Sequence, residues 1–265
     1  MGSDRRSGEG RRPATEVRLG PDARSALAAL GLAEPAELLR GGLGEVVRET
    51  PHRRTERLRT ASGRECYHKL YGPGAGRIGK IHPRRAPAEV EWARAAALAG
   101  AGLPIPPFLC AVWGPEGDRA PSAVLLAGLP GARPLDLVLR DEGPTEARLA
   151  WLRGPLLDLV HDLHAAGFQH RDLYAAHVLV AAGDAPVLID LARVRRQERL
   201  ARRRRVKDLA ALAHSLRDLV PEAFVDEWIR AYGVRSTLPP ERLLRSVRRK
   251  AARIAAHVPR YDRPA

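Results

Sequence analysis

The chain has 265 residues, 45% of them hydrophobic, which is enough to bury the core of one two-lobed domain or of two small domains. It contains no apolar run of about 18 residues and no signal-peptide core, so neither a membrane span nor export is indicated and a cytoplasmic protein is expected. The formal net charge is +14, and the two cysteines, Cys66 and Cys110, lack the spacing of a metal site.

Residues 1–20 are predicted to form a flexible basic tail, because Met1–Pro13 is rich in Gly, Ser, Arg and Glu and has no apolar periodicity. A β-rich N-lobe over residues 21–128 is expected to follow. Its predicted elements are three strands between residues 46 and 71, an Ala-rich helix over 88–98, and strands near 108–113 and 123–127.

The segment Gly128-Leu129-Pro130-Gly131 is the predicted hinge to a mostly helical C-lobe over residues 129–265. A helix is predicted over 145–166, where leucines recur at helical spacing and Pro155 is expected to kink or split the helix. Further helices are predicted over 206–219, 221–232 and 240–258. These elements together predict a bilobal α+β fold.

The most informative stretch contains His170-Arg171-Asp172, with His177 five residues and Asp190 eighteen residues after Asp172. Two short apolar runs between His177 and Asp190 are separated by a turn-rich segment, which predicts a hairpin. Such a hairpin brings Asp172, His177 and Asp190 together. The sequence therefore predicts a cluster of chemically active side chains in the C-lobe.

This spacing is typical of kinase-type phosphoryl transfer, in which one Asp orients and deprotonates the attacking hydroxyl. Asp172 is the candidate for that role, while Asp190 and His177 are the candidate metal ligands. Imidazole suits Mg²⁺ less well than oxygen ligands do, so the role of His177 stays open. Arg171 is expected to support the loop or the acceptor. His170 is a further catalytic candidate, with a packed, hydrogen-bonded structural histidine as the alternative.

A kinase also needs a cation on the nucleotide phosphates, and Lys69 on the predicted strand 64–71 is the candidate. Glu91, 22 residues later on the predicted helix, is expected to pair with Lys69 and fix its reach, with Glu89 as the alternative partner. Taken alone, Lys69 also fits a solvated residue of an edge strand. In combination with the two aspartates it predicts ATP and Mg²⁺ as cofactors.

The glycines of residues 41–44 suggest a phosphate-binding loop, but this interpretation fails on distance. Two hairpins must fit between these glycines and Lys69, with turns near 51–52 and 61–63. The turn that covers the nucleotide phosphates is therefore predicted at about residues 50–55, where Arg53 and Arg54 are candidate phosphate ligands. An exposed basic hairpin tip is the alternative for these two arginines.

Over roughly residues 44–220 the chain resembles the lipopolysaccharide kinases, the Kdo and heptose kinases within the protein-kinase-like superfamily. The segments that carry the resemblance are Val46-Val47-Arg48-Glu49, Arg53-Arg54-Thr55, Glu91-Trp92, His170-Arg171-Asp172-Leu173-Tyr174 with His177, Ile189-Asp190-Leu191, and Lys207-Asp208-Leu209-Ala210. The resemblance implies a protein-kinase-like fold and ATP-dependent phosphorylation of a sugar hydroxyl on a lipid-linked glycan. It also implies that Asp208 accepts hydrogen bonds from backbone amides of the His170-Arg171-Asp172 loop.

Other features separate the chain from signalling protein kinases. No Ser, Thr or Tyr lies between Asp190 and His214, so this segment offers no site for activation-loop phosphorylation. A kinase of the same fold that acts on a small molecule or a protein remains an alternative, as does a catalytically silent binding protein.

Arginines crowd the segment from Arg193 to Arg205. Three explanations are open: attraction to anionic membrane lipid or a phosphorylated glycan, nonspecific nucleic-acid binding, or an arginine-biased but solvated surface. Nucleic acid is the least favoured, because few aromatic residues accompany the arginines and no nucleic-acid-binding module is present.

Overall fold

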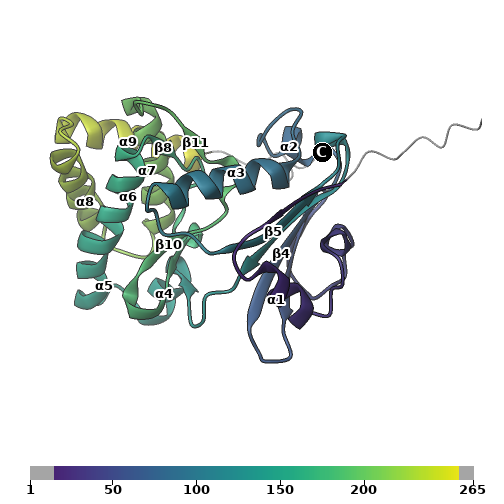
Figure 1. Ribbon diagram of the computed structural model, residues 1–265. Helices are drawn as coiled ribbons and strands as arrows, with labels where there is room; N and C mark the ends of the chain where they lie inside the picture. The colour runs from purple at the N-terminus through teal and green to yellow at the C-terminus, as the bar shows by residue number, and fades with distance from the viewer. Residues whose placement is uncertain (1–14, 257–265) are drawn as a thin grey trace, which may run out of the picture.

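A six-stranded antiparallel sheet forms the N-lobe of the computed structural model, which describes residues 15–256 (Figure 1). The strands lie in the order β1-β5-β6-β4-β3-β2. Their bounds are β1 Glu16–Leu19, β2 Glu45–Thr50, β3 Arg53–Arg59, β4 Glu65–Tyr71, β5 Phe108–Trp113 and β6 Ser122–Ala127. Strand β4, which carries Lys69, pairs with β3 on one side and β6 on the other. Lys69 therefore lies on an interior strand and not on the edge of the sheet.

The two faces of this sheet are covered by different segments. Helix α3 (Pro87–Gly100) packs on one face and extends toward the C-lobe (Figure 1). Helix α1 (Ala23–Ala29) and the 3₁₀-helix Pro35–Leu39 cover the other face and bury a separate small core. Because side chains alternate along a strand, Lys69 and Tyr71 share the face of β4 that α3 covers, while His68 points to the opposite core.

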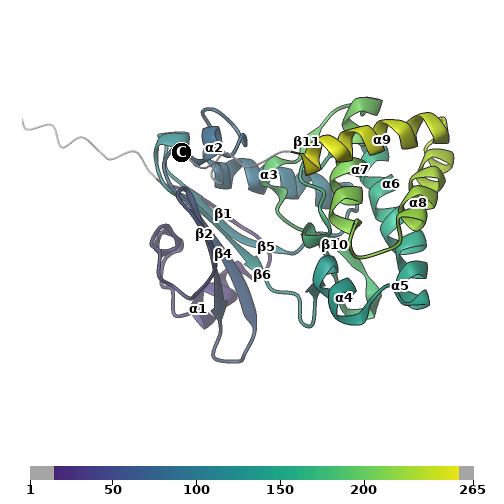
Figure 2. The same cartoon turned by 180° about the vertical axis from the view of Figure 1, so that it is seen from behind.

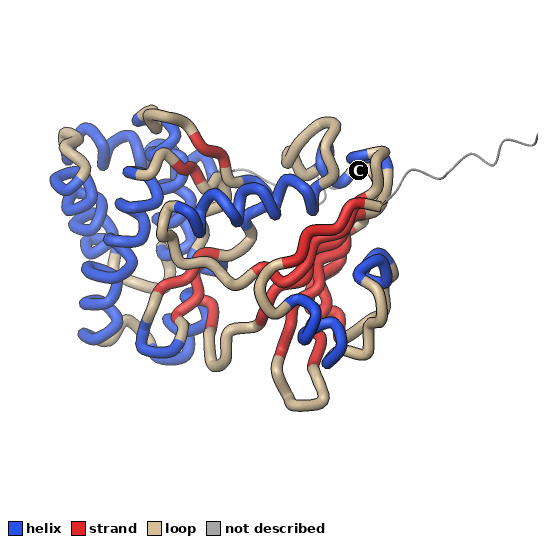
Figure 3. Tube along the Cα trace, in the orientation of Figure 1, coloured by secondary structure: helices blue, strands red, loops and turns tan. Residues whose placement is uncertain are grey.

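The C-lobe is mostly helical and contains only short strands, whereas the large sheet belongs to the N-lobe (Figure 3). Figure 2 shows α7, α8 and α9 packed together at the end far from the large sheet. The helices of this lobe are α4 Leu135–Glu142, α5 Glu146–Trp151, α6 Leu157–Ala165, α7 Arg202–Leu216, α8 Glu222–Arg235 and α9 Pro240–Ala255. None of the helices in residues 15–256 has the length and apolarity that crossing a bilayer requires.

Short strands position the loop that contains His170, Arg171 and Asp172 within this lobe. Strands β9 (Val178–Val180) and β10 (Pro186–Leu188) form the predicted hairpin, with β7 (Arg133–Pro134) beside β9. Strand β8 (Phe168–Gln169) pairs with β11 (Arg195–Arg196). The first pairing brings the segment after residue 170 next to Asp190, and the second brings the arginine-rich segment to the start of the same loop.

The long helix is irregular at Pro155, but the predicted split does not occur. A π-helical turn over Leu152–Leu156 contains Pro155 and joins α5 to α6, so the helix is continuous but irregular. Proline has no backbone N–H and its ring clashes with the preceding turn, so the regular hydrogen-bond pattern is interrupted there.

Several boundaries differ from the prediction. The predicted tail over residues 1–20 is wrong at its end, because Glu16–Leu19 forms β1, which pairs with β5; residues 1–14 lie outside the described range. Helix α7 begins at Arg202 and not at residue 206, since arginine is a good helix former. Helix α9 ends at Ala255, and the last residues of its predicted span lie outside the described range. Helices α1, α2 (Ala75–Ile78) and α4 were not predicted.

Candidate active site

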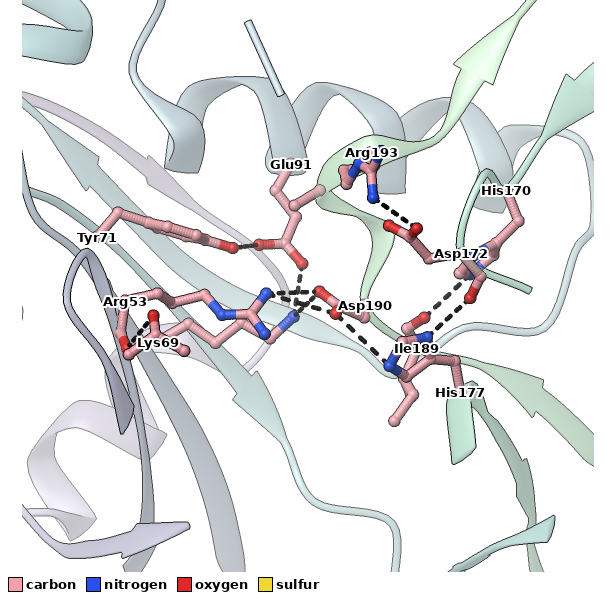
Figure 4. A network of polar contacts seen from close by, with 12 residues as sticks. Arg53, Lys69, Tyr71, Glu91, His170, Asp172, His177, Ile189, Asp190 and Arg193 are labelled. Carbon is pink, nitrogen blue, oxygen red and sulfur yellow. Dashed lines mark hydrogen bonds and ion pairs between the residues drawn. The ribbon is translucent and has the colours of Figure 1, made fainter. Parts of the chain in front are cut away.

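Lys69 and Glu91 form an ion pair between strand β4 and helix α3 (Figure 4). The Lys69 Nζ lies 2.7 Å from Glu91 Oε1, and the Glu91 side chain is fully buried. Burial alone would lower the pKa of Lys69, but attraction from Glu91 and then Asp190 outweighs it and raises that pKa. Lys69 is therefore a fixed, charged donor at neutral pH.

Tyr71 holds the other oxygen of the same carboxylate. Its hydroxyl donates to Glu91 Oε2, and Tyr71 is 1% exposed. Burial, followed by the charge of Glu91, raises the pKa of Tyr71 well above its ordinary value, so the phenol stays protonated and acts as a donor. Both oxygens of Glu91 are thus occupied, which leaves the carboxylate little freedom to turn away from Lys69.

Asp190 lies opposite this pair, at the end of the C-lobe hairpin. Its carboxylate is 3.0 Å from Arg53 Nη1 and 3.6 Å from Lys69 Nζ, so it connects the two lobes (Figure 4). Burial would raise the pKa of Asp190, but Lys69 and Arg53 reverse the effect and hold the pKa far below its usual value. Its backbone adopts φ 58°, a left-handed conformation that Asp tolerates better than most residues.

His177 lies between the two aspartates. Its Nδ1 is 2.7 Å from the backbone carbonyl of Asp172, which only accepts, so Nδ1 carries the hydrogen and donates. The Nε2 atom lies 3.7 Å from Asp190 Oδ2. The hydrogen on Nδ1 leaves Nε2 as the ring nitrogen that could bind a metal ion beside the candidate metal-binding carboxylate.

The carboxylate of Asp172 is paired with Arg193. Arg193 Nη1 donates to Asp172 Oδ1 at 2.6 Å, and both side chains are partly exposed, at 28% and 17%. An arginine three residues after Asp190 thus contacts the candidate catalytic base.

The loop that carries Asp172 is held by Asp208 of α7. The fully buried Asp208 carboxylate accepts hydrogen bonds from the backbone N–H groups of His170 at 2.7 Å and Arg171 at 2.9 Å. The His164 ring lies 3.3 Å from the same carboxylate. The contact that the resemblance implies for Asp208 is present, and it fixes a loop in which Arg171 has a left-handed backbone, with φ 75°.

His170 faces the hairpin and not the open side of the site. Its Nε2 donates to the carbonyl of Ile189 at 3.0 Å, and the ring is fully buried. Burial is the largest influence on the pKa of His170 and lowers it, so the ring is neutral at physiological pH. These contacts match the structural alternative for His170, a residue that ties the catalytic loop to the segment before Asp190.

Other candidates lie apart from this cluster. Arg54 points to the opposite face of the sheet, where its Nε is 3.0 Å from the buried Glu56. Glu89 pairs with Arg85 at 2.9 Å and not with Lys69. The backbone amides of Gly42 and Leu43 donate to Glu56 at 2.7 and 3.0 Å. Since these amides are already occupied, the contacts agree with the rejection of a phosphate loop at residues 41–44.

Two residues of the cluster were not singled out from the sequence. Tyr71 is two residues after Lys69, and the period of a strand places it on the same face, which was an available signal. Arg193 was treated only as part of a basic run. Its contact with Asp172 depends on the 3₁₀ turn Leu191–Arg193, which no pattern in the sequence indicated.

The side chains present fit a nucleotide-bound Mg²⁺ better than a free metal ion. Within residues 15–256 no group of three or more His, Cys, Asp or Glu side chains is arranged to hold a metal. Asp190 offers one ionised carboxylate and His177 one nitrogen. Mg²⁺ is commonly bound by one or two carboxylates together with substrate phosphates and water, so phosphate oxygens would complete such a site.

The two-lobed fold, with a lysine–glutamate pair in the N-lobe and two aspartates in the C-lobe, defines a protein-kinase-like phosphotransferase. The sequence model of the "Lipopolysaccharide kinase (Kdo/WaaP) family" matches residues 40–232. The chain is also 32% identical over 206 residues to the lipopolysaccharide core heptose(I) kinase WaaP of Pseudomonas aeruginosa, covering 70% of this chain and 75% of that protein. The chain therefore belongs to the lipopolysaccharide kinase (Kdo/WaaP) family, as the sequence resemblance predicted.

Proposed function

We propose that this enzyme transfers the γ-phosphate of ATP, with Mg²⁺, to a sugar hydroxyl of the lipopolysaccharide core or of a related lipid-linked glycan. Family membership supports ATP-dependent phosphorylation of a sugar hydroxyl. The observation that carries the proposal is the convergence of Lys69 and Asp190, 3.6 Å apart, although one belongs to the N-lobe sheet and the other to the C-lobe hairpin.

The nucleotide phosphates are held from the N-lobe side in this mechanism. Lys69, fixed by Glu91, contacts the phosphates, and Arg53 is the second cation on the same side. Both cations lie next to Asp190, on the side of the site where the phosphates would bind. Of the two arginines considered for this role, Arg53 is retained and Arg54 is not, because Arg54 faces Glu56.

The acceptor is activated from the C-lobe side. Asp172 orients the attacking hydroxyl, and one of its carboxylate oxygens accepts the proton as the hydroxyl oxygen bonds to the γ-phosphorus. The bond from that phosphorus to the β–γ bridging oxygen breaks, and ADP leaves. Arg171 and Tyr174 support the loop or the acceptor. Asp190 would hold Mg²⁺, which would neutralise charge on the phosphates. His177, whose Nε2 lies 3.7 Å from Asp190 Oδ2, is the candidate second ligand. We assign His170 a supporting role, consistent with its buried contact with Ile189.

The proposed acceptor is suggested by one relative. The Pseudomonas protein is named for heptose I of the lipopolysaccharide core, and we propose a core sugar as the acceptor here as well. We also propose that the reaction takes place at the cytoplasmic face of the inner membrane, where ATP and a membrane-bound glycolipid would meet.

A competition between acceptors tests this proposal. The purified enzyme with MgATP is offered core lipopolysaccharide, an aminoglycoside and a generic protein substrate, and phosphate transfer to each is measured. Preferential transfer to the lipopolysaccharide supports the proposal. Transfer only to the aminoglycoside or only to the protein would refute it and would identify that class of acceptor instead. A thermal-shift titration with MgATP tests the catalytically silent alternative. A ligand selective for the folded state must raise its stability, so the absence of any shift would favour that alternative.

A further inference from the structure

A strongly basic pocket lies beside the catalytic loop. It has a volume of about 750 Å³, and nine of its twelve lining residues are Arg or Lys, with no acidic residue among them. The cations come from the first turns of α7, from the second half of α9, and from the segments around β8 and β11. Figure 2 shows α7, α9 and β11 next to one another.

None of these nine cations forms an ion pair with another residue in the range 15–256. Their neighbours along the chain behave differently, since Arg193 pairs with Asp172 and Arg248 with Asp226. Burial and then neighbouring arginines lower the pKa of both Arg171 and Lys207, two residues of the pocket. The pocket therefore concentrates positive charge that no acidic side chain of residues 15–256 neutralises by an ion pair.

The pocket borders the loop that carries the candidate catalytic base, because Arg171 is part of its lining. Arg171 precedes Asp172 in the chain, and Lys207 precedes Asp208, whose carboxylate holds the backbone of the same loop. A molecule that fills the pocket therefore contacts the loop that orients the acceptor hydroxyl. Lys69 and the nucleotide-binding side of the site are not part of its lining.

We propose that this pocket binds phosphate groups already carried by the acceptor, so that the substrate is a phosphorylated glycan whose reacting hydroxyl is presented to Asp172. This inference rests on the proposed function and deepens it. Guanidinium groups bind phosphate oxygens in pairs, and several cations from different elements can enclose one phosphate. A concave pocket suits individual phosphate groups better than the flat surface of a bilayer, which separates this proposal from simple membrane attraction.

Two charge reversals test the pocket, with a matched control. Arg249→Glu and Arg203→Glu change exposed pocket residues on α9 and α7, and Arg245→Glu makes the same change on an exposed α9 position outside the lining. We expect the KM for core lipopolysaccharide to rise about tenfold or more in both pocket variants, because each loses a charged contact to phosphate. The KM for ATP should stay at the wild-type value, and Arg245→Glu should match wild type in both constants.

Removal of phosphate from the acceptor gives the complementary test. Core lipopolysaccharide dephosphorylated with hydrofluoric acid should show the raised KM with the wild-type enzyme, and the pocket variants should then differ little from wild type. An unchanged KM in the pocket variants, an equal rise in Arg245→Glu, or an unchanged wild-type KM after dephosphorylation would each overturn the proposal.

Two further measurements separate the alternatives. If lipopolysaccharide accepts no phosphate at all, the proposed function fails, and the pocket is then tested by titrating inorganic pyrophosphate in saturating ADP; stabilisation of wild type and Arg245→Glu but not of Arg249→Glu supports an anion site. Cosedimentation with phosphatidylglycerol vesicles that lack glycan tests the membrane explanation. Vesicle binding that Arg249→Glu abolishes, with the KM for lipopolysaccharide unchanged, would assign the pocket to the membrane and refute our proposal.

Discussion

Arg193 Nη1 lies 2.6 Å from Asp172 Oδ1, so the candidate catalytic base is already in contact with a cation from the segment that follows Asp190. Such a contact orients the carboxylate. If Asp172 is the base, it also places a positive charge close to the position where the γ-phosphate would meet the acceptor hydroxyl. Arg193 is therefore well placed to stabilise negative charge that develops during transfer.

We expect Arg193→Ala to lower kcat by roughly 10- to 100-fold, because both the orientation of Asp172 and a nearby positive charge are lost. Arg193→Lys should restore part of the rate, since it keeps the charge but not the planar geometry. Steady-state kinetics of the two variants measures kcat, with the KM for ATP as a second readout. Arg199→Ala, an exposed arginine of the same basic run, is the control, and an equal loss there would remove any specific role for Arg193.

Asp172→Asn keeps the size of the side chain but removes the proton acceptor. We expect kcat to fall by about 10²- to 10⁴-fold, the usual range for general-base catalysis, while binding of MgATP persists. Single-turnover transfer and a thermal-shift titration with MgATP measure the two properties separately. Asp218→Asn, at an exposed position, should behave as wild type; wild-type turnover by Asp172→Asn would exclude the carboxylate as the base.

The contact between Tyr71 and Glu91 should contribute mainly to stability. Tyr71→Phe removes a buried donor to a charged acceptor, and we expect the free energy of unfolding to fall by about 1.5–3 kcal/mol. The Lys69–Glu91 pair remains, so the KM for ATP should change little, whereas Lys69→Ala should strongly weaken productive ATP binding. Chemical denaturation measures the first effect. Tyr67→Phe is the control, since Tyr67 is partly exposed on the same strand and lies 3.5 Å from Glu65.

The buried Glu56 should make the stability of the protein depend on acidic pH. Burial raises the pKa of Glu56, but the N–H groups of Gly42 and Leu43, and then His68, outweigh burial and hold the pKa below its ordinary value. The folded state thus binds this proton less readily than the unfolded chain. The resulting stabilisation is fully present above the unfolded pKa of about 4.3 and is lost as the pH falls through the lower, folded value.

Urea unfolding between pH 6 and the onset of acid unfolding checks this expectation. Glu56→Gln should be less stable than wild type at pH 6, and the difference should shrink as the pH falls. If the free energy of unfolding falls equally with pH in wild type and Glu56→Gln, carboxylates other than Glu56 determine the loss of stability in acid. Glu198→Gln, at an exposed position, serves as the control and should follow wild type throughout.

Much of the arrangement was predictable because it depends on local patterns. Strand and helix periods placed Lys69 on a strand and Glu91 on a helix, and the turn-rich segment before Asp190 predicted the hairpin that brings it to Asp172. The partner of Lys69 was predicted correctly, since Glu91 and not Glu89 contacts it.

The remaining features depend on tertiary packing. Arg53 and Arg54 are adjacent in the sequence, but the alternation of a strand sends one to Asp190 and the other to Glu56, and the register that decides between them comes from pairing with β4. The segment Glu16–Leu19 is short and has little intrinsic preference for strand structure. It forms a strand because it can pair with the edge of β5. The contact of Arg193 with Asp172 likewise requires the turn after Asp190.

Helix α3 touches both lobes: Glu91 holds Lys69 in the N-lobe, and Arg94 donates to the carbonyl of Ala192 in the C-lobe. One rigid element therefore joins the lysine–glutamate pair to the segment that follows Asp190. A displacement of α3 would disturb both sides of the candidate site at once, so the two lobes are coupled through this helix.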